Sequence, residues 1–306
     1  MTAPAVASRD VVALVLAAVC WGLGTVVSKA ALAEIPPVSL LTIQLGASLV
    51  TLTALMWWKG IPLRRDGPRL LGRLGLLNPG AAYALGLLGL TTITASVSVL
   101  LWALEPLMIL LLAAVFLRER VTPGLIALSA VAIAGIVLVV YEPTSVGGQV
   151  VGVTLTLAGI ACCAAYTVIT RRFIPDASET SQVVLSQQAH GLVLAVALVG
   201  GVAVVGGQLV PAALSPAGLG SAVLSGVMYY AAAYWLYLGA LRRVPASIAA
   251  GSFYLIPIVG VTAGALLLGE RLGPTQWVGA VIVLASVLGI LGRTAGATAP
   301  VVARQT

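Results

Sequence analysis

A succession of long apolar stretches constrains this chain more than any other feature of its sequence. A helix that crosses a bilayer needs about 20 apolar residues, and ten such stretches can be marked along the 306 residues. They are 11–33, 38–58, 70–90, 95–117, 123–141, 150–170, 183–205, 217–240, 246–269 and 275–292. Only 8% of the residues are charged, whereas a soluble domain carries roughly 25%. The sequence therefore predicts an all-α integral membrane protein with ten transmembrane helices.

The connections and the chain ends leave little room for anything else. The longest connection, 59–69, is too short for a separate domain, and residues 294–306 are predicted to be a disordered cytoplasmic tail. The first stretch is longer than the apolar core of a signal peptide, so we interpret it as a retained helix. The three cysteines, Cys20, Cys162 and Cys163, lie inside apolar stretches, where we expect packing rather than disulfides or a metal site.

The basic residues indicate how the chain is oriented in the membrane. If the N-terminus lies inside, 14 of the 16 Lys and Arg residues fall on the cytoplasmic side, and only Lys29 and Arg271 lie outside. Because Lys and Arg favour cytoplasmic connections, we expect a multi-pass protein of the cell (inner or plasma) membrane with both termini in the cytoplasm. The basic pI of about 9.7 then reflects orientation, and no nucleic-acid partner is expected.

The chain also contains an internal repeat. Shifting the sequence by 151 residues aligns 83–123 with 234–274, and 13 of these 41 positions are identical. Leu and Ala matches carry little information in such a composition. The informative matches are Tyr83 with Tyr234, Ala95-Ser96 with Ala246-Ser247, Pro106 with Pro257, Glu119-Arg120 with Glu270-Arg271, and Pro123 with Pro274. The two halves of the chain are therefore predicted to share one structure.

Each half holds five apolar stretches, an odd number, so the two halves must enter the membrane in opposite orientations. We expect two inverted five-helix repeats, 1–145 and 146–293. Secondary transporters with inverted repeats interrupt equivalent helices and bind substrate near the midplane. Pro106 and Pro257 are the predicted interruptions and hinges.

These features together resemble the drug/metabolite transporter superfamily, EamA type. The resemblance is carried by the ten stretches, by Trp21-Gly22, and by the two helix ends Leu117-Arg118-Glu119-Arg120 and Leu268-Gly269-Glu270-Arg271. It implies a bacterial inner-membrane carrier, commonly an exporter of amino acids or related metabolites driven by the proton gradient. The superfamily includes the aromatic amino acid exporters called YddG, which no residue here singles out. Many members carry Arg near the position of Gln44, so this chain departs from them there.

Glu105 is the acid in the middle of an apolar stretch. A carboxylate at mid-depth costs about 2.5–3.5 kcal/mol on insertion scales and marks a functional site by default. Ser98, Trp102 and Glu105 have the spacing of one helix face, and Phe253 matches Trp102 in the other half. We expect this face to line a substrate cavity, with Glu105 coupling substrate to protons. The alternative is a permanently protonated acid bonded to a neighbouring helix.

Further candidates for the cavity are His190, Gln187, Tyr83, Tyr234 and Trp21. His190 is the only histidine and shares a helix face with Gln187, and it could relay protons. The plainer interpretation is a histidine whose ring is satisfied within the structure. For the aromatic residues, core packing is as good an explanation as a cavity wall. Glu119 and Glu270, at helix ends beside arginines, are expected to pair with those neighbours and to terminate their helices.

The predicted function is secondary active transport: export of small metabolites such as amino acids or amphipathic organic cations by alternating access, with protons as the coupling ion. A channel or a membrane-embedded enzyme is the alternative. An enzyme of that kind needs a nucleophile with a base, paired acids or metal ligands, so we expect no enzyme activity, cofactor or metal. Both a monomer and a homodimer are compatible with the sequence.

Overall fold

The computed structural model describes residues 8–62, 69–118, 123–140, 148–173, 181–209, 214–241, 243–244 and 252–297. Every regular element in these ranges is helical. In the first half they are α1 (Ser8–Ala31), α2 (Pro37–Trp58), α3 (Arg69–Arg73), η1 (Leu74–Leu76), η2 (Leu77–Ala81), α4 (Ala82–Leu90), α5 (Ala95–Trp102), α6 (Glu105–Phe116) and α7 (Pro123–Val140). In the second half they are α8 (Gly148–Phe173), α9 (Ser181–Val204), α10 (Pro216–Gly226), η3 (Val227–Ala232), α11 (Ala233–Leu241), α13 (Leu255–Leu268) and α14 (Pro274–Ala297).

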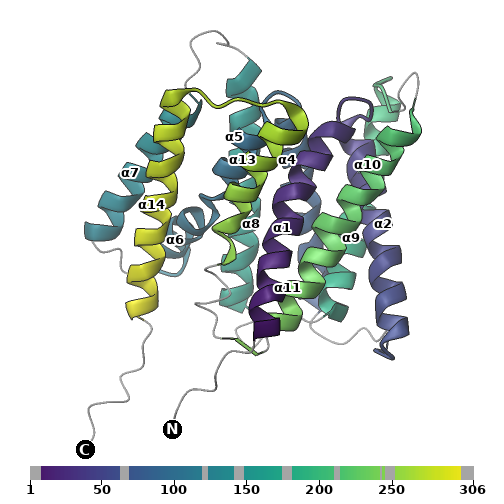
Figure 1. The fold of residues 1–306 in the computed structure, drawn as a ribbon. Helices are drawn as coiled ribbons and strands as arrows, with labels where there is room; N and C mark the ends of the chain where they lie inside the picture. The colour runs from purple at the N-terminus through teal and green to yellow at the C-terminus, as the bar shows by residue number, and fades with distance from the viewer. Residues whose placement is uncertain are drawn as a thin grey trace, which may run out of the picture.

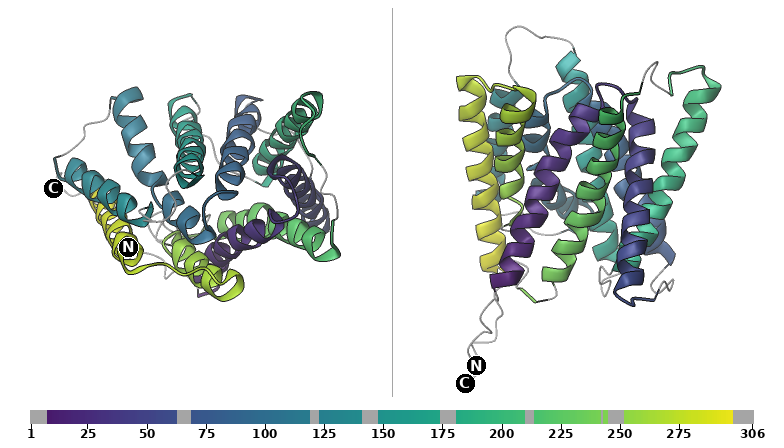
Figure 2. Two further views of the ribbon diagram at one scale, coloured as in Figure 1. Left: turned by 90° about the horizontal axis from the view of Figure 1, so that it is seen from above. Right: turned by 45° about the vertical axis from the view of Figure 1, so that its right-hand side comes forward.

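The helices stand side by side in one bundle, and most are seen end-on from above (Figures 1 and 2). α1 begins and α14 ends at the same face, which we call the terminal face; the opposite one is the far face (Figure 1). The last helices of the two halves, α7 and α14, pack against each other at one side of the bundle. These two equivalent helices are therefore neighbours.

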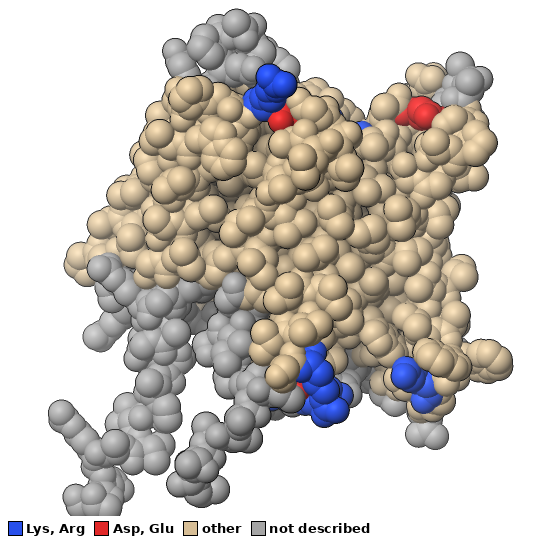
Figure 3. All heavy atoms as spheres, viewed as in Figure 1, with Lys and Arg blue, Asp and Glu red and all other residues tan. Residues whose placement is uncertain are grey.

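The surface is that of a protein in lipid. In Figure 3 the charged side chains gather at the two ends of the bundle, with an uncharged belt between them. Large apolar side chains face outward in this belt; Val115, Leu266 and Val281, for example, are each more than 60% exposed. Six helical stretches of the described residues are long and apolar enough to cross a membrane, and three further apolar helices are shorter. The all-α membrane fold is confirmed, while the count of ten spans stays a prediction.

In each half, a turn of two residues lies just before the helix that carries the repeated proline. α5 ends at Trp102 and α6 starts at Glu105, while in the second half α13 starts at Leu255, within one residue of the position equivalent to Glu105. Pro106 and Pro257 each lie in the first turn after the break, where a helix needs no backbone N–H donor. Their role as hinges stays a prediction.

The third stretch of each half is interrupted as well. η2 and η3 are wider, π-helical turns, and η2 shifted by 151 residues falls within η3. Asn78 in η2 has non-helical dihedral angles, φ −136° and ψ 113°. Turns of this kind often occur at functional sites, and they bring two irregular segments into the centre of the bundle.

The helices that follow the breaks end in the same way. Arg118, just after α6, has φ 55°, and Gly269, just after α13, has φ 67°; these two positions are equivalent in the repeat. The left-handed conformation stops each helix, without cost for Gly269 and at a cost for Arg118. Glu119 lies outside the described residues.

Glu270 has a different role from the one expected. Its carboxylate accepts hydrogen bonds from Ala95 N at 2.7 Å, Ser96 N at 2.9 Å and Ser96 Oγ at 2.6 Å. It therefore caps the N-terminus of α5, where unpaired N–H groups favour a negative charge. The expectation that Glu270 serves mainly to pair with Arg271 was wrong in this respect.

Two other side chains form hydrogen bonds between helix ends at the far face. Lys29 Nζ donates to Leu90 O at 2.7 Å and to Ile93 O at 2.9 Å, at the end of α4. Glu34 accepts from Ser215 N at 2.8 Å and Ser215 Oγ at 2.7 Å, at the start of α10. These hydrogen bonds from Ser215 lower the pKa of Glu34. Loop and helix ends from both halves are thus held together at this face.

Candidate functional site

The centre of the bundle is built from aromatic side chains around Tyr83 on α4. Its ring stacks on Trp102 with a centroid distance of 5.4 Å. The rings of Tyr229 and Tyr230 meet it edge-on, at 5.4 and 5.2 Å. Gly86, one turn after Tyr83, makes room for Trp102, since a Cβ there would lie 3.2 Å from the indole ring. Offset and edge-on arrangements of this kind are the favourable ones for aromatic rings.

A second aromatic group surrounds Trp21 on α1. Its ring lies 5.5 Å from Tyr234, 5.6 Å from Tyr237 and 5.4 Å from Phe253. Tyr237 and Phe253 also contact each other, with ring centroids 5.0 Å apart. The rings of the two groups come from α1, α4, α5, η3 and α11 and from Phe253 just before α13, so the aromatic centre joins the two repeats.

The two groups meet through a pair of equivalent residues. The hydroxyl oxygens of Tyr83 and Tyr234 lie 3.5 Å apart, and these tyrosines occupy matching positions in the two repeats. The contact therefore joins equivalent positions of the two repeats at the centre of the bundle.

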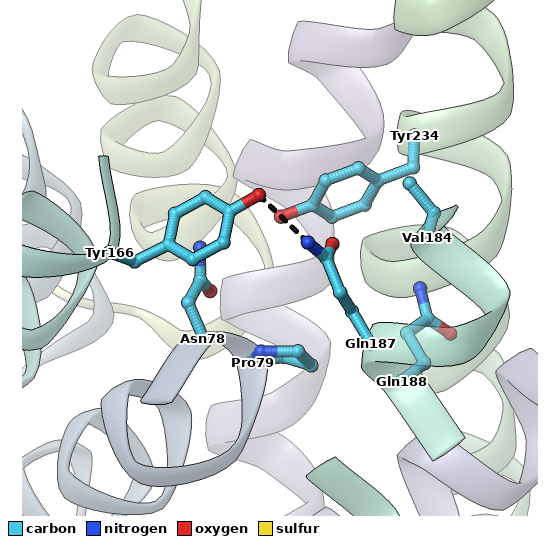
Figure 4. A pocket seen from close by; sticks show the side chains of 7 residues that line it. All are labelled: Asn78, Pro79, Tyr166, Val184, Gln187, Gln188 and Tyr234. Atoms are coloured by element: carbon cyan, nitrogen blue, oxygen red, sulfur yellow. Dashed lines mark hydrogen bonds between the residues drawn. The ribbon is translucent and has the colours of Figure 1, made fainter. Parts of the chain in front are cut away.

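Two small cavities lie on opposite sides of the tyrosine pair. We call the first the far chamber, because it lies toward the end of α1 and α4; it is lined by Thr25, Ser28, Tyr83, Gly86, Leu87, Leu90, Ser98, Trp102, Tyr229 and Tyr230. The second, the terminal chamber, lies beside the start of α9 (Figure 4); it is lined by Asn78, Pro79, Tyr166, Val184, Gln187, Gln188 and Tyr234. Each tyrosine of the pair lines one chamber.

Neither chamber is lined by a charged side chain, as far as the described residues show. In the far chamber, Thr25 and Ser28 donate their hydroxyl protons to carbonyls of their own helix. Ser28 also accepts from Gln44 Nε2 at 2.8 Å. The walls therefore offer aromatic faces and uncharged oxygen atoms, which suit an apolar or cationic group better than an anion.

The structure brings most of the predicted site residues together. Ser98, Trp102 and Tyr83 line the far chamber. Gln187 and Tyr234 line the terminal chamber. Trp21 contacts Tyr234 directly, and Phe253 contacts Trp21.

Glu105 and His190 line neither chamber. Glu105 is half-buried at the start of α6, within electrostatic reach of Tyr229 and Cys163. A turn at Ala103 and Leu104 separates it from α5, which carries Ser98 and Trp102. His190 Nδ1 lies 2.8 Å from Ser186 O, one turn back on α9, which agrees with the plainer interpretation of this residue.

Several lining residues did not enter the predicted set: Thr25, Ser28, Asn78, Gln188, Tyr229 and Tyr230. A signal existed for Asn78, since Asn78-Pro79 interrupts an apolar stretch with a polar residue and a helix breaker. No comparable signal marks Thr25 or Ser28. Hydroxyls of this type are common in membrane helices, where they bond to their own backbone.

Comparison with known proteins points to one class. The model of the EamA-like transporter family matches the chain twice, at residues 9–141 and 150–292. An uncharacterized transporter of Archaeoglobus fulgidus is 25% identical over 272 residues, 85% of this chain and 91% of its own. The uncharacterized transporter YwfM of Bacillus subtilis is 27% identical over 158 residues, 51% of this chain. A solved crystal structure with 17% identity covers 94% of this chain with a TM-score of 0.61, and shows likeness of fold alone.

Proposed function

Because the chain belongs to the EamA-like transporter family, we propose that it moves small amphipathic molecules across the membrane by alternating access, as a proton-coupled exporter. The observation that carries this proposal is the contact of Tyr83 with Tyr234 between two chambers. Each chamber lies toward one face of the bundle. A carrier needs a central barrier with access from alternate sides, and equivalent breaks in inverted halves provide matching movable parts.

The chamber walls favour a substrate with an apolar or aromatic part and a positive or zwitterionic head. Stacked rings around Tyr83 and Trp102 can hold a flat apolar group or the face of a cation. Amino acids with apolar side chains and organic cations both fit this description. A phosphate or dicarboxylate would require basic side chains, and the described lining residues include none.

Glu105 is our candidate for the proton-coupling group. It lies outside the chamber walls, but its charge acts on Tyr229, which lines the far chamber. A proton on Glu105 removes that charge, and an ammonium group in the chamber favours the charged form. Protons and substrate would then oppose each other's binding electrostatically, which is the requirement for exchange of substrate against protons.

Transport in proteoliposomes tests the proposal. Purified protein is reconstituted with unlabelled phenylalanine inside, and uptake of labelled phenylalanine or phenethylamine is measured with and without a pH gradient. A carrier gives accelerated uptake when substrate is present on the other side, whereas a channel does not. We expect Glu105→Gln to keep this exchange but to lose accumulation driven by the pH gradient. Equal accumulation by Glu105→Gln and the parent would remove Glu105 from the mechanism.

The orientation of the chain is part of the proposal. The distribution of Lys and Arg supports ten spans with both termini in the cytoplasm. A cysteine placed at Thr275, on the far face, should react with an impermeant maleimide in intact cells, whereas one at Lys59 should react only after lysis. The opposite pattern would reverse the topology.

A further inference from the structure

The terminal chamber holds a buried polar atom without a partner. Among the described residues three buried side-chain atoms lack a hydrogen bond: Gln44 Oε1, Asn78 Oδ1 and Thr170 Oγ1. Of these residues only Asn78 lines a chamber. An unsatisfied buried acceptor is unfavourable, so a residue that keeps one beside a cavity is suited to receive a donor from a molecule entering that cavity.

The neighbouring amides of Gln187 and Gln188 bond to the protein, and Gln188 Oε1 already accepts from Ser48 Oγ at 2.6 Å. Gln187 Nε2 donates to Leu71 O at 3.2 Å and to Tyr166 Oη at 2.8 Å (Figure 4). These two bonds fix the orientation of the amide and occupy both of its N–H donors. Gln188 Nε2 likewise donates to Tyr230 O at 2.7 Å. Both glutamine nitrogens thus donate to the protein, and Asn78 Oδ1 is the acceptor of this wall that lacks a partner.

The position and size of the chamber limit what can fill it. It lies on the terminal side of the Tyr83–Tyr234 contact, and Tyr166 and Tyr234 contribute rings to its wall. It has room for a group about the size of a water molecule, which in a polar cavity needs 2–4 polar partners. An ammonium group is of that size and brings only donors. Its charge is also attracted to aromatic faces.

We propose that the terminal chamber is a binding subsite for the ammonium group of the transported molecule, with Asn78 Oδ1 as its main acceptor. This inference rests on the proposed function and adds to it. The amine end is held on the terminal side of the tyrosine pair, apart from the aromatic far chamber. Asn78 would be a specificity residue, selecting cationic nitrogen over a neutral or anionic head group of the same shape.

Binding in detergent tests this without transport. Three probes share a phenyl ring and differ in the head group: phenethylamine, 2-phenylethanol and 3-phenylpropionate. Quenching of tryptophan fluorescence reports binding, because Trp21 and Trp102 lie in the aromatic centre. We expect phenethylamine to bind at least about tenfold more tightly than the other two, since a hydrogen bond to a charged donor is worth that factor or more.

The variants separate a binding role from a structural one. Asn78→Leu should weaken phenethylamine binding by about tenfold or more, yet leave the thermal stability of the empty protein unchanged or higher, because it removes an unpaired polar atom. Asn78→Asp should bind phenethylamine more tightly as pH rises and the carboxyl ionises, and it serves if the leucine variant does not fold. Thr170→Val is the matched control, since it removes another unpaired buried oxygen outside both chambers, and it should bind like the parent.

Several results would overturn the assignment. Unchanged phenethylamine affinity in both Asn78 variants would place the amine elsewhere. Equal binding of 2-phenylethanol and phenethylamine would show that the site does not recognise the positive charge. A stabilisation by NaCl over choline chloride that depends on Asn78, without one by phenethylamine, would make this a sodium site. Failure of the transport proposal looks different: phenethylamine would bind with the expected dependence on Asn78, but no exchange would occur in proteoliposomes.

Discussion

Replacing Glu270 should destabilise the protein through the start of α5 rather than through its own helix. The carboxylate accepts three hydrogen bonds from Ala95 and Ser96, between 2.6 and 2.9 Å long. Loss of an N-terminal cap costs about 0.5–2 kcal/mol, and loss of a negative charge at a helix start adds about 0.3–1 kcal/mol. Glu270 is partly exposed, which argues for the middle of these ranges. We expect Glu270→Ala to lower the free energy of unfolding by about 2 kcal/mol.

The assay is equilibrium unfolding in mixed micelles with increasing denaturing detergent, followed by circular dichroism. Ser96→Ala removes one of the three bonds and should cost less, about 0.5–1.5 kcal/mol. The double variant should resemble Glu270→Ala, because Ser96 Oγ then has no carboxylate to bond. Arg271→Ala is the control, since it removes the exposed charge next to Glu270. Equal losses for Arg271→Ala and Glu270→Ala would show that pairing between these neighbours, and not the cap, accounts for the effect.

Three further predictions follow from single features of the fold. Arg118→Gly should raise the free energy of unfolding by about 1 kcal/mol, because only glycine adopts the left-handed conformation of this position without cost; an unchanged unfolding curve would refute this. Pro106→Ala combined with Pro257→Ala should leave the protein folded by circular dichroism but slow exchange in proteoliposomes, and unaltered exchange would leave the prolines without a hinge role. Glu34 has a pKa lowered by Ser215, so the stability it contributes is present above its unfolded pKa of about 4.3 and is lost as pH falls through the lower folded value. The melting temperature of Glu34→Gln should therefore approach that of the parent at acidic pH, and a constant difference at all pH values would exclude this linkage.

The repeat explains how much of the centre could be predicted from the sequence. The match of Tyr83 with Tyr234 and of Trp102 with Phe253 depends only on the offset of 151 residues, which needs no knowledge of packing. The match left open whether these tyrosines face a cavity or pack in the core, and only the structure shows that their hydroxyls meet. The offset also matches Pro106 with Pro257, which made the helix breaks beside them predictable.

The position of Glu105 could not be predicted in this way. The prediction placed it on one face with Ser98 and Trp102 by assuming a continuous helix across residues 98–105. The structure places a turn at Ala103 and Leu104, between Trp102 and Glu105, and the far chamber is lined by Ser98 and Trp102 but not by Glu105. A proline indicates that a break is near, but the direction of the chain after the break depends on tertiary packing. The capping of α5 by Glu270 was missed because it joins residues 174 and 175 positions apart.

The asymmetry between the two halves shows how a symmetric scaffold can recognise an asymmetric molecule. Asn78 and Tyr229 occupy equivalent positions in the two π-helical turns, and each lines a different chamber. Because each chamber takes only one of these two equivalent positions, a substitution in one half changes one chamber only. Here it gives an amide acceptor on the terminal side and an aromatic ring on the far side. A molecule with an amine at one end and an aromatic group at the other would match both walls in one orientation only. It would then cross the midplane only when the contact between Tyr83 and Tyr234 opens, and this links substrate shape to the step that changes access.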